Sequence, residues 1–483
     1  MRKRFEQQLK LGQIPISDVY ITQKSRDAMP ALLTALKAIF LDKKIHEAIF
    51  KVLESTIPVK KHGRKGMDLW CIFVLSQVRM CLNISYDRLH DLACNHSSLR
   101  QIMGIETEFG YEKIKFDYYQ IYDNVTLLTD DTLEQLNDII VKFGHIIFKK
   151  KEEEAIKTKS DSFVVESDVH FPTDYNLLWD CIRKCLDIIF KMLEKDQTIE
   201  GWRKIDNWYY ILKGMMRSLA RAKAGGGIKK EERVQLTTEQ YLQKAIALSK
   251  KIHKQKEDLP LSDPEDLALI LALENYLKLL DKHIDLVDRR ILKKEVIPHQ
   301  EKLFSIFETY TEWIKKGKNR PEVELGKIAT ITSDQFNLII DCHINENESD
   351  SQVVPCIGDR ILAKYNIEKW SFDKGFFSRE NKKLLELFIP KVVMPKKGKL
   401  NAQEKQEESS PKFIKTKNAH SAVESNINEL EHRGLNRCPD KGYKNFKRYI
   451  RMGICAYNLH KIGKELIKIA NEEEKRQKLR NAA

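Results

Sequence analysis

The segment SDSFVVESDVHF, residues 160–171, separates two kinds of sequence. It is rich in β-branched and aromatic residues and stops before Pro172, a pattern that predicts a β-strand. From residue 29 to residue 150, by contrast, apolar side chains recur at three- and four-residue spacing, which predicts helices. The strand and the few residues after it carry four carboxylates, at Asp161, Glu166, Asp168 and Asp174. Because a buried carboxylate is costly without a positive partner, a positive group is expected among them.

The composition is that of a soluble globular protein with two or three domains. The chain has 483 residues, of which 42% are hydrophobic and 32% are charged. Its 84 Lys and Arg exceed its 70 Asp and Glu, giving a formal net charge of +14. An excess of this size indicates a polyanionic partner, most often nucleic acid, although a basic but unspecialised surface would explain it equally well.

The cysteines and the apolar runs point to a reducing compartment and exclude a membrane span. The nine cysteines are scattered and form no C-x-x-C pair, so we expect neither disulfides nor a zinc site, and Cys181 and Cys185 are predicted to be core thiols. The charged start of the chain has no apolar signal region. The longest apolar runs, at 69–75 and 267–273, are too short to cross a bilayer. We therefore expect a cytoplasmic protein.

Three regions follow from the periodicity. Residues 1–150 are predicted to form an all-α N-terminal domain, in which the helix pair at 84–105 resembles either a helix-turn-helix or an ordinary bundle element. Lysine-rich residues 148–159 look like a linker. Residues 175–319 are predicted to be a large helical insertion, with Trp202 and Trp208 packing in its core rather than stacking on a base.

Strand patterns on both sides of this insertion predict one mixed α/β domain, residues 160–174 and 320–475, with a central sheet. A hairpin is expected around Ser333–Asp334, followed by a segment at 350–365 that is helical in its second half. A strand ending at Asp373, a short helix, a further strand and helices at about 419–433 and 443–475 complete the domain.

A strand-borne Asp, an Asp at the end of another strand and a helical Glu can converge in such a fold. Three carboxylates can hold two Mg²⁺ ions for an in-line phosphoryl transfer, chemistry that suits a polyanionic substrate. Val423, Ile427 and Leu430 are spaced to face the sheet, which places Glu424 at the edge of that buried face. On the residues alone, however, Glu424 also fits a solvated helix stripe, and Asp373 fits a turn before Gly375.

Several segments together resemble DDE-type insertion-sequence transposases, in particular the ISNCY-like group, which have a ribonuclease-H-like catalytic fold. The strongest are DSFVVESDVHFPTDYNLLWD (161–180), SFDKGFFSRENKKLL (371–385), VVMPKKGKL (392–400) and the run at 420–463; residues 63–89 and 299–327 contribute as well. By position, the resemblance implies that Asp161, Asp373 and Glu424 are the catalytic residues and bind two Mg²⁺ or Mn²⁺ ions. Preferring Asp161 to Asp168 rests on this resemblance, because strand alternation alone does not decide it.

The surroundings of the Glu depart from related groups, which have a Tyr, an Arg and a Lys where this chain has Lys417, His420 and Glu431. The supporting roles therefore cannot be transferred directly. Candidate supporting residues are His420, Asp168, His170, Lys374 and Arg433, while Asp174 is expected to cap the helix that follows it. Candidate DNA contacts are Arg64, Lys65, Lys396, Lys397, Lys441, and the stripe Lys444, Arg448 and Arg451.

The resemblance implies a transposase that cleaves DNA at terminal inverted repeats and transfers the freed strand into target DNA. The N-terminal helices would bind the repeats, and a homodimer or larger assembly would pair two ends on double-stranded DNA in the prokaryotic nucleoid. Two alternatives remain open on the sequence: a ribonuclease-H-like nuclease or resolvase without strand transfer, and a domesticated DNA-binding protein without catalysis.

Overall fold

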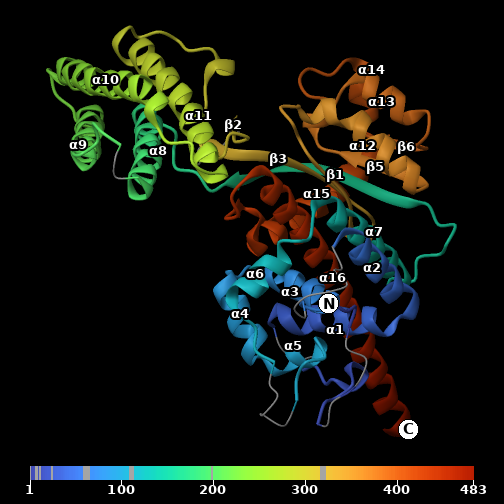
Figure 1. Ribbon diagram of the computed structural model, residues 1–483. Coiled ribbons are helices and arrows are strands. Elements are labelled where there is room, and N and C mark those ends of the chain that lie inside the picture. The colour runs from blue at the N-terminus through green and yellow to red at the C-terminus, as the bar shows by residue number, and fades with distance from the viewer. Residues whose placement is uncertain are drawn as a thin grey trace. The chain divides into compact units, whose positions relative to one another are not determined.

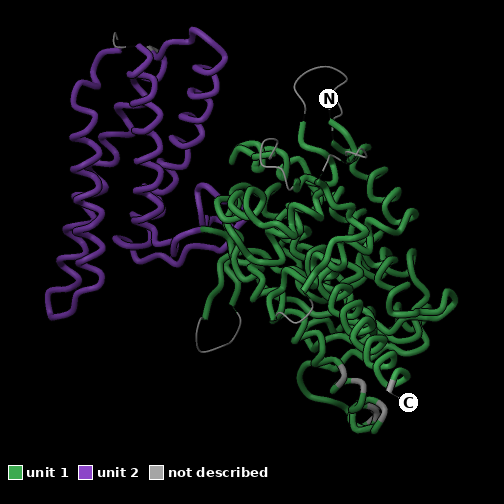
Figure 2. Tube along the Cα trace, turned by 90° about the horizontal axis from the view of Figure 1, so that it is seen from below, with its two compact units in different colours: residues 1–168, 312–483 green, residues 169–311 purple. Residues whose placement is uncertain are grey.

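The computed structural model describes residues 2–5, 9, 12–22, 26–57, 66–107, 114–196, 199–315 and 322–482. These residues form two compact units (Figure 2). The first comprises residues 1–168 and 312–483, and the second comprises residues 169–311. The second unit therefore corresponds to the helical insertion expected at 175–319, although it begins and ends a few residues earlier.

The N-terminal part of the first unit is helical, as the periodicity predicts. Its helices are α1 (Ala28–Leu41), α2 (Lys43–Thr56), α3 (Leu69–Cys81), α4 (Tyr86–Asn95), α5 (Ser97–Ile102), α6 (Tyr118–Val125) and α7 (Asp130–Ile147). Helix α3 is buried along its whole length. The predicted pair at 84–105 is α4 and α5, which meet at His96.

The strands within the described residues all belong to one mixed sheet. They are β1 (Ile156–Ser167), β2 (Glu312–Lys315), β3 (Val323–Ser333), β4 (Ile339–Ile344), β5 (Ile367–Phe372), β6 (Lys391–Val393) and β7 (Arg437–Cys438). Strand β1 lies between β3, which is antiparallel to it, and β5, which is parallel to it. The predicted hairpin is β3–β4, and β6 continues the parallel side. Strand β1 starts four residues before the predicted strand, within the expected linker, because these residues pair with β5.

Helices cover both faces of this sheet (Figure 1). On one side, α12 (Asp350–Lys364) and α13 (Arg379–Glu386) bury apolar side chains against Trp370 and Phe372 of β5. On the other side lie α15 (Pro411–Leu430) and α16 (Tyr443–Ala482). Helix α12 is helical throughout and includes Pro355, so the prediction that only its second half is helical is wrong. Helix α15 likewise starts earlier than expected.

Helix α16 joins the N-terminal helices to the sheet. The side chain of Asn458 donates to Asn137 Oδ1 of α7 at 2.8 Å and accepts from the backbone N–H of Ile339 of β4 at 2.8 Å. Asn458 is completely buried, so these bonds satisfy a polar group in the interior. The N-terminal helices and the sheet consequently form one compact unit, where the sequence suggested two domains.

The second unit is built from α8 (Asp174–Lys195), α9 (Ile205–Ala224), α10 (Lys230–Gln255) and α11 (Pro264–Val287). Trp202, Cys181 and Cys185 are buried in its core, as predicted. Thr173, not Asp174, caps α8, because its hydroxyl accepts from the N–H of Asn176. Asp174 instead pairs with Arg290 at 3.0 Å. None of the helices in the described residues is long and apolar enough to cross a membrane.

Residues 169–311 expressed alone are expected to fold, because every residue of their core cluster comes from this segment. Circular dichroism should show a helical spectrum with a cooperative thermal transition. Leu277→Ala, at a site 2% exposed on α11, should lower the free energy of unfolding by about 2–5 kcal/mol. Leu271→Ala, at a site 58% exposed on the same helix, should change it by less than about 0.5 kcal/mol. A non-cooperative, unfolded fragment would contradict this expectation.

Candidate active site

The register between β1 and β5 brings two of the predicted acids together. In this parallel pair Lys159 lies opposite Ser371 and Ser160 lies opposite Phe372. If the same register continues by one residue, Asp161 lies opposite Asp373. Neighbouring strands are about 4.8 Å apart, and residues in register face the same side of a sheet. Asp161 and Asp373, separated by 212 positions in the sequence, therefore lie side by side where β5 ends.

A buried hydrogen bond holds this register. The indole N–H of Trp370 donates to the hydroxyl of Ser160 at 2.7 Å, and both residues are completely buried. A slip of one residue would turn Trp370 and Phe372 to the opposite face of the sheet. The core under α12 thus fixes the relative position of the two acids on the other face.

Helix α15 adds the third predicted acid from that face. The imidazole Nδ1 of His420 lies 3.2 Å from the hydroxyl of Ser371, two residues before Asp373. Glu424 follows His420 by one helical turn. Val423 and Leu430 are buried, as their spacing predicted, and Glu424 is exposed at the edge of the buried face. The side-chain amide of Asn426 donates to Ser333 of β3 at 3.2 Å and anchors the helix.

A fourth carboxylate, Asp350, belongs to the same group and was not predicted. It is the first residue of α12 and accepts a hydrogen bond from Ser162, the neighbour of Asp161. Its Oδ1 atom is buried without a hydrogen-bond partner. A Cβ atom at Gly375 would lie only 2.6 Å from Asp350 Oδ2, so the glycine makes room for this carboxylate. The signal available in the sequence was the serine before Asp350, which is typical of a helix start.

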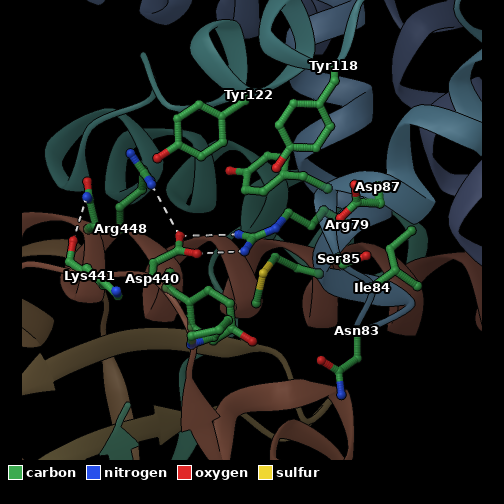
Figure 3. A pocket seen from close by; sticks show the side chains of 15 residues that line it. Arg79, Asn83, Ile84, Ser85, Asp87, Tyr118, Tyr122, Asp440, Lys441 and Arg448 are labelled. Carbon is green, nitrogen blue, oxygen red and sulfur yellow. Dashed lines mark hydrogen bonds and ion pairs between the residues drawn. The ribbon is translucent and has the colours of Figure 1, made fainter. Parts of the chain in front are cut away.

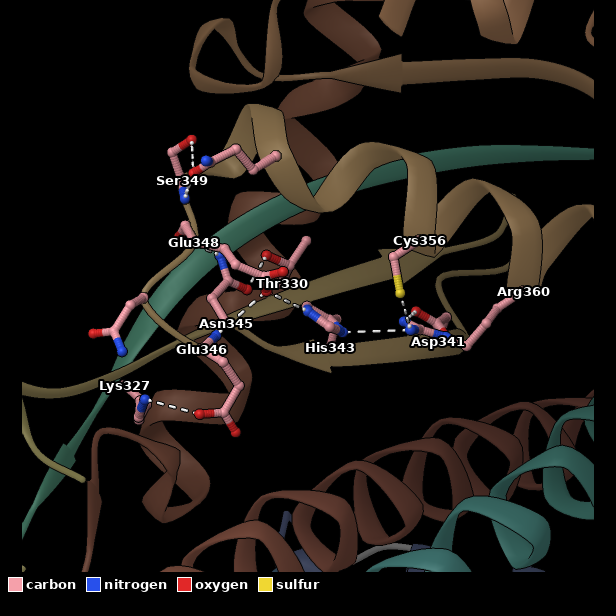
Figure 4. Close-up of polar contacts among 12 residues, drawn as sticks. Lys327, Thr330, Asp341, His343, Asn345, Glu346, Glu348, Ser349, Cys356 and Arg360 are labelled. Atoms are coloured by element: carbon pink, nitrogen blue, oxygen red, sulfur yellow. Dashed lines mark hydrogen bonds and ion pairs between the residues drawn. The ribbon is translucent and has the colours of Figure 1, made fainter. Parts of the chain in front are cut away.

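A polar network positions the start of α12 (Figure 4). The side-chain oxygen of Gln352 accepts from the backbone N–H of Ser349 at 2.8 Å, a helix-capping contact. Just before it, Glu348 contacts the imidazole of His343 on β4 at 3.0 Å. Further along the helix, Arg360 binds Asp341 of β4 at 2.8 Å. The helix is thereby tied to β4, and Asp350 is held at the sheet edge.

The four acids repel one another electrostatically. Burial is the main cause that raises the pKa of Asp161 to about 7; the charges of Asp373, Asp350 and Glu424 contribute to this rise, and a hydrogen bond from the Ser162 N–H opposes it. Burial also raises the pKa of Asp350, and Asp373 adds to this effect, while Lys397 opposes it. Mutual repulsion of this kind is typical of sites that bind a cation or transfer protons.

The acids are near one another but do not form a closed chelate. Among the described side chains, no three His, Cys, Asp or Glu residues lie close enough together to bind a metal ion without moving. The donor set nevertheless suits a hard cation, because it consists of carboxylate oxygens and includes the unpartnered Oδ1 of Asp350. Small movements of exposed Asp373 and Glu424 would be needed to complete the coordination.

His420 is a neutral group within this site. Burial lowers the pKa of its imidazole to about 4, against the charge of Asp373, which raises it. Its Nδ1 is engaged with Ser371, and its Nε2 is buried without a partner. At neutral pH the ring therefore carries no charge, which makes it an unsuitable counter-ion for phosphate. It remains suited to hold a water molecule or a metal ion through Nε2.

The other predicted supporting residues have local partners. Asp168 pairs with Arg437 at 2.7 Å, and His170, in the second unit, contacts Asp180 at 2.6 Å. Lys374 is exposed directly after Asp373. Arg433 donates to the backbone carbonyl of Cys81 at 2.7 Å and lies 3.1 Å from Glu429, so it fastens η7 (Glu431–Leu435) to α3.

The predicted basic stripe on the last helix does not face solvent as a unit. Arg448 is 5% exposed and binds Asp440, while Arg451 pairs with Asp130 and Glu134 of α7. Only Lys444 of the stripe is exposed. Of the remaining candidates, Lys396 pairs with Glu404 at 2.6 Å, Lys397 and Lys441 are exposed, and Arg64 and Lys65 lie outside the described residues.

Comparison of the chain with protein-family models, with curated proteins and with solved structures finds no match. A functional assignment therefore depends on the geometry and chemistry of the acidic site and on the charge of the surface.

The raised pKa of Asp161 predicts a pH-dependent stability in the absence of divalent ions. The folded protein keeps this proton up to about pH 7, whereas an unfolded chain releases it near about pH 4. The stabilisation that results is complete below about pH 4 and is lost as the pH rises to about 7. Thermal unfolding in EDTA should therefore show Asp161→Asn gaining stability relative to the wild type between pH 5 and pH 8.

Asp168→Asn is the matched control for this titration. It removes a carboxylate from the same strand region, but one that is exposed and paired with Arg437, so it should show no such gain. If the melting temperatures of the wild type and Asp161→Asn changed in parallel with pH, the predicted burial of the Asp161 charge would be wrong.

Proposed function

We propose that this protein is a metal-dependent DNA transposase of the DDE type, with Asp161, Asp373 and Glu424 as its catalytic acids. The observation that carries the proposal is the convergence of these three residues, from two parallel strands and a covering helix, on one face of the sheet. The mixed sheet, with its first strand between an antiparallel hairpin and parallel strands, supports a ribonuclease-H-like core.

Divalent cations fit the acidic site. Asp161, Asp373 and Glu424 would hold Mg²⁺ or Mn²⁺, and Asp350 offers an unpartnered oxygen next to them. When bound, a pair of such ions activates a water molecule and neutralises charge on the reacting phosphate. The raised pKa of Asp161 indicates that this group needs a positive partner to ionise fully at neutral pH.

The surrounding residues of the chain have separate roles in this proposal. Neutral His420 would orient a water molecule through Nε2 while Ser371 holds the other side of its ring. Exposed Lys397, whose charge acts on Asp350, would hold a DNA phosphate beside the acids. Strand transfer would use the same acids, because the 3′ hydroxyl freed by cleavage takes the place of water in the second reaction.

A polyanionic partner is supported by the charge of the α9–α10 hairpin in the second unit. Residues 203–256, which include α9 and α10, contain fourteen Lys and Arg but only four acids, Asp206, Glu231, Glu232 and Glu239. Within the described part of the chain, eight exposed cations of this hairpin have no carboxylate within 4 Å: Arg203, Lys204, Arg217, Arg221, Lys229, Arg233, Lys250 and Lys254. Unpaired surface cations of this density suit the phosphates of double-stranded DNA.

The assay that tests the proposal uses a labelled duplex carrying the inverted repeats that flank the gene, a target plasmid and Mg²⁺. The wild type should cleave the duplex and join it to the plasmid. Asp161→Asn, Asp373→Asn and Glu424→Gln should each lower the rate by on the order of 100-fold or more, because each removes a negative ligand of the metal pair. Asp168→Asn should retain activity.

Other outcomes of this assay separate the alternatives. Cleavage without joined product would identify a nuclease or resolvase, and binding without cleavage by any variant would identify a DNA-binding protein that lacks catalysis. Full activity in Asp161→Asn with loss in Asp168→Asn would show that the first acid has been assigned to the wrong residue.

The α9–α10 surface predicts a change in the salt dependence of DNA binding. Neutralising Arg217, Lys250 and Lys254 to Gln should weaken binding to any duplex. If all three contact phosphates, the slope of log K against log salt should fall in magnitude by about 3. Fluorescence anisotropy at several salt concentrations, in EDTA, measures both effects.

The matched control neutralises three lysines of the same unit, Lys278, Lys293 and Lys294. The last two already pair with Asp288 and Glu231, so this variant should leave the slope nearly unchanged. Equal slopes for the wild type and the α9–α10 variant would contradict a role of this surface in DNA binding.

A further inference from the structure

The first unit has a cavity of about 550 Å³ (Figure 3), and none of the four acids of the candidate active site lines it. It is formed where the end of α3, the start of α4, helix α6 and the start of α16 meet. We call it the tyrosine–arginine pocket, after the side chains that dominate its wall: Arg79, Tyr86, Tyr118, Tyr122, Arg448 and Tyr449. Its volume lies within the range of about 300–1,000 Å³ that is typical of small-molecule sites.

The pocket carries an unbalanced positive charge. Arg79 and Arg448 are 4% and 5% exposed, and both bind the same carboxylate, Asp440, at 2.7 Å and 3.2 Å. The two other charged residues of the wall, Lys441 and Asp87, are exposed and opposite in sign. One positive charge is thus left over at a largely dry site, which favours an anionic ligand.

Hydrogen-bond donors without a partner also favour an anionic ligand in the pocket. The Nε atoms of Arg79 and Arg448 and the hydroxyl of Tyr86 are buried without a partner among the described residues. All three side chains are more than nine-tenths buried. Burial raises the pKa of Tyr86 to about 12, so its hydroxyl keeps its proton and can donate. Unsatisfied donors in one place are uncommon in folded proteins and call for an explanation.

The remaining wall is aromatic. The guanidinium of Arg79 lies over the ring of Tyr86 at 4.2 Å, and the ring of Tyr122 stands edge-on to Tyr86 with centroids 4.9 Å apart. Tyr122 is 39% exposed, and Tyr118 lines the pocket beside it from the same helix (Figure 3). Exposed tyrosine faces of this kind are platforms on which nucleobases stack.

We propose that the tyrosine–arginine pocket binds a single nucleotide, with its phosphate toward Arg448 and Lys441 and its base against Tyr118 and Tyr122. The proposal rests on the proposed function for its source, an unpaired nucleotide of a DNA strand. A free mononucleotide has the same chemistry and is the other possible source. The site is separate from the acids, so it positions a strand and takes no part in the bond-breaking step.

The test measures equilibrium binding by calorimetry in EDTA, so that cleavage does not interfere. Three probes are compared: thymidine monophosphate, a ten-residue oligothymidylate and a blunt duplex. The wild type should bind the oligothymidylate. Tyr122→Ala should weaken that binding on the order of tenfold, since a stacked base contributes about 1–3 kcal/mol, while duplex binding stays unchanged. Lys441→Gln should also weaken binding of the oligothymidylate, and it should reduce the salt dependence of that binding.

Tyr119→Ala is the matched control, because Tyr119 is on the same helix, is 70% exposed and does not line the pocket. It should bind like the wild type. Unchanged duplex binding and an unchanged thermal midpoint exclude misfolding of Tyr122→Ala. Thymidine monophosphate could bind as tightly as the oligothymidylate, with its affinity lowered equally by Tyr122→Ala. This result would support the pocket as a binding site and identify a free nucleotide as its ligand.

Two results would overturn the inference. One is that the wild type binds neither thymidine monophosphate nor the oligothymidylate, and the other is binding that Tyr122→Ala and Lys441→Gln leave intact. Failure of the proposed function is distinguishable from both, because it appears as a wild type that binds the oligothymidylate yet never cleaves the terminal-repeat duplex in Mg²⁺.

Discussion

The parallel register of β1 and β5 is the constraint on which the candidate site depends. Trp370 donates a buried hydrogen bond to Ser160 on one face of the sheet, and the register that this bond holds places Asp161 beside Asp373 on the other face. Since side chains alternate strictly along a strand, the apolar face cannot move without carrying the acids away from each other. The packing of α12 on one face of the sheet therefore fixes the relative position of Asp161 and Asp373 on the other face.

Two helices complete the site from different directions. Helix α15 covers the acidic face and supplies His420 and Glu424, and the start of α12 supplies Asp350 at the edge of the sheet. Asp161 and Asp350 are partly buried, and burial, with a contribution from the neighbouring charges, raises the pKa of Asp161 to about 7. Such an arrangement is unfavourable by itself and becomes favourable with a cation. This electrostatic need connects the fold to the proposed chemistry, in which the basic α9–α10 hairpin and the tyrosine–arginine pocket would contact DNA.

Much of the fold followed from sequence patterns, and the errors have identifiable causes. Short-range periodicity placed the helices, the β3–β4 hairpin and the insertion, whereas β2 and β7 were missed because such short strands leave no periodic signal. Arg448 and Arg451 were read as a surface stripe from their spacing, but that face of α16 meets Asp440 and the acids of α7. Spacing shows which residues share a face, and only the packing shows what the face contacts. Asp350 was missed for the same reason, because nothing near it in the chain relates it to Asp161.

The sequence by itself determined the mixed α/β class, the helical insertion and the excess of positive charge, because these depend on composition and on neighbours within a few residues. The resemblance to DDE transposases added the three acids, which remain a proposal for function. Only the tertiary structure decided that Asp161 lies beside Asp373, that Asp350 joins them, and that two buried arginines share one carboxylate. These facts depend on strand register and helix packing between residues hundreds of positions apart, where local propensity carries no information.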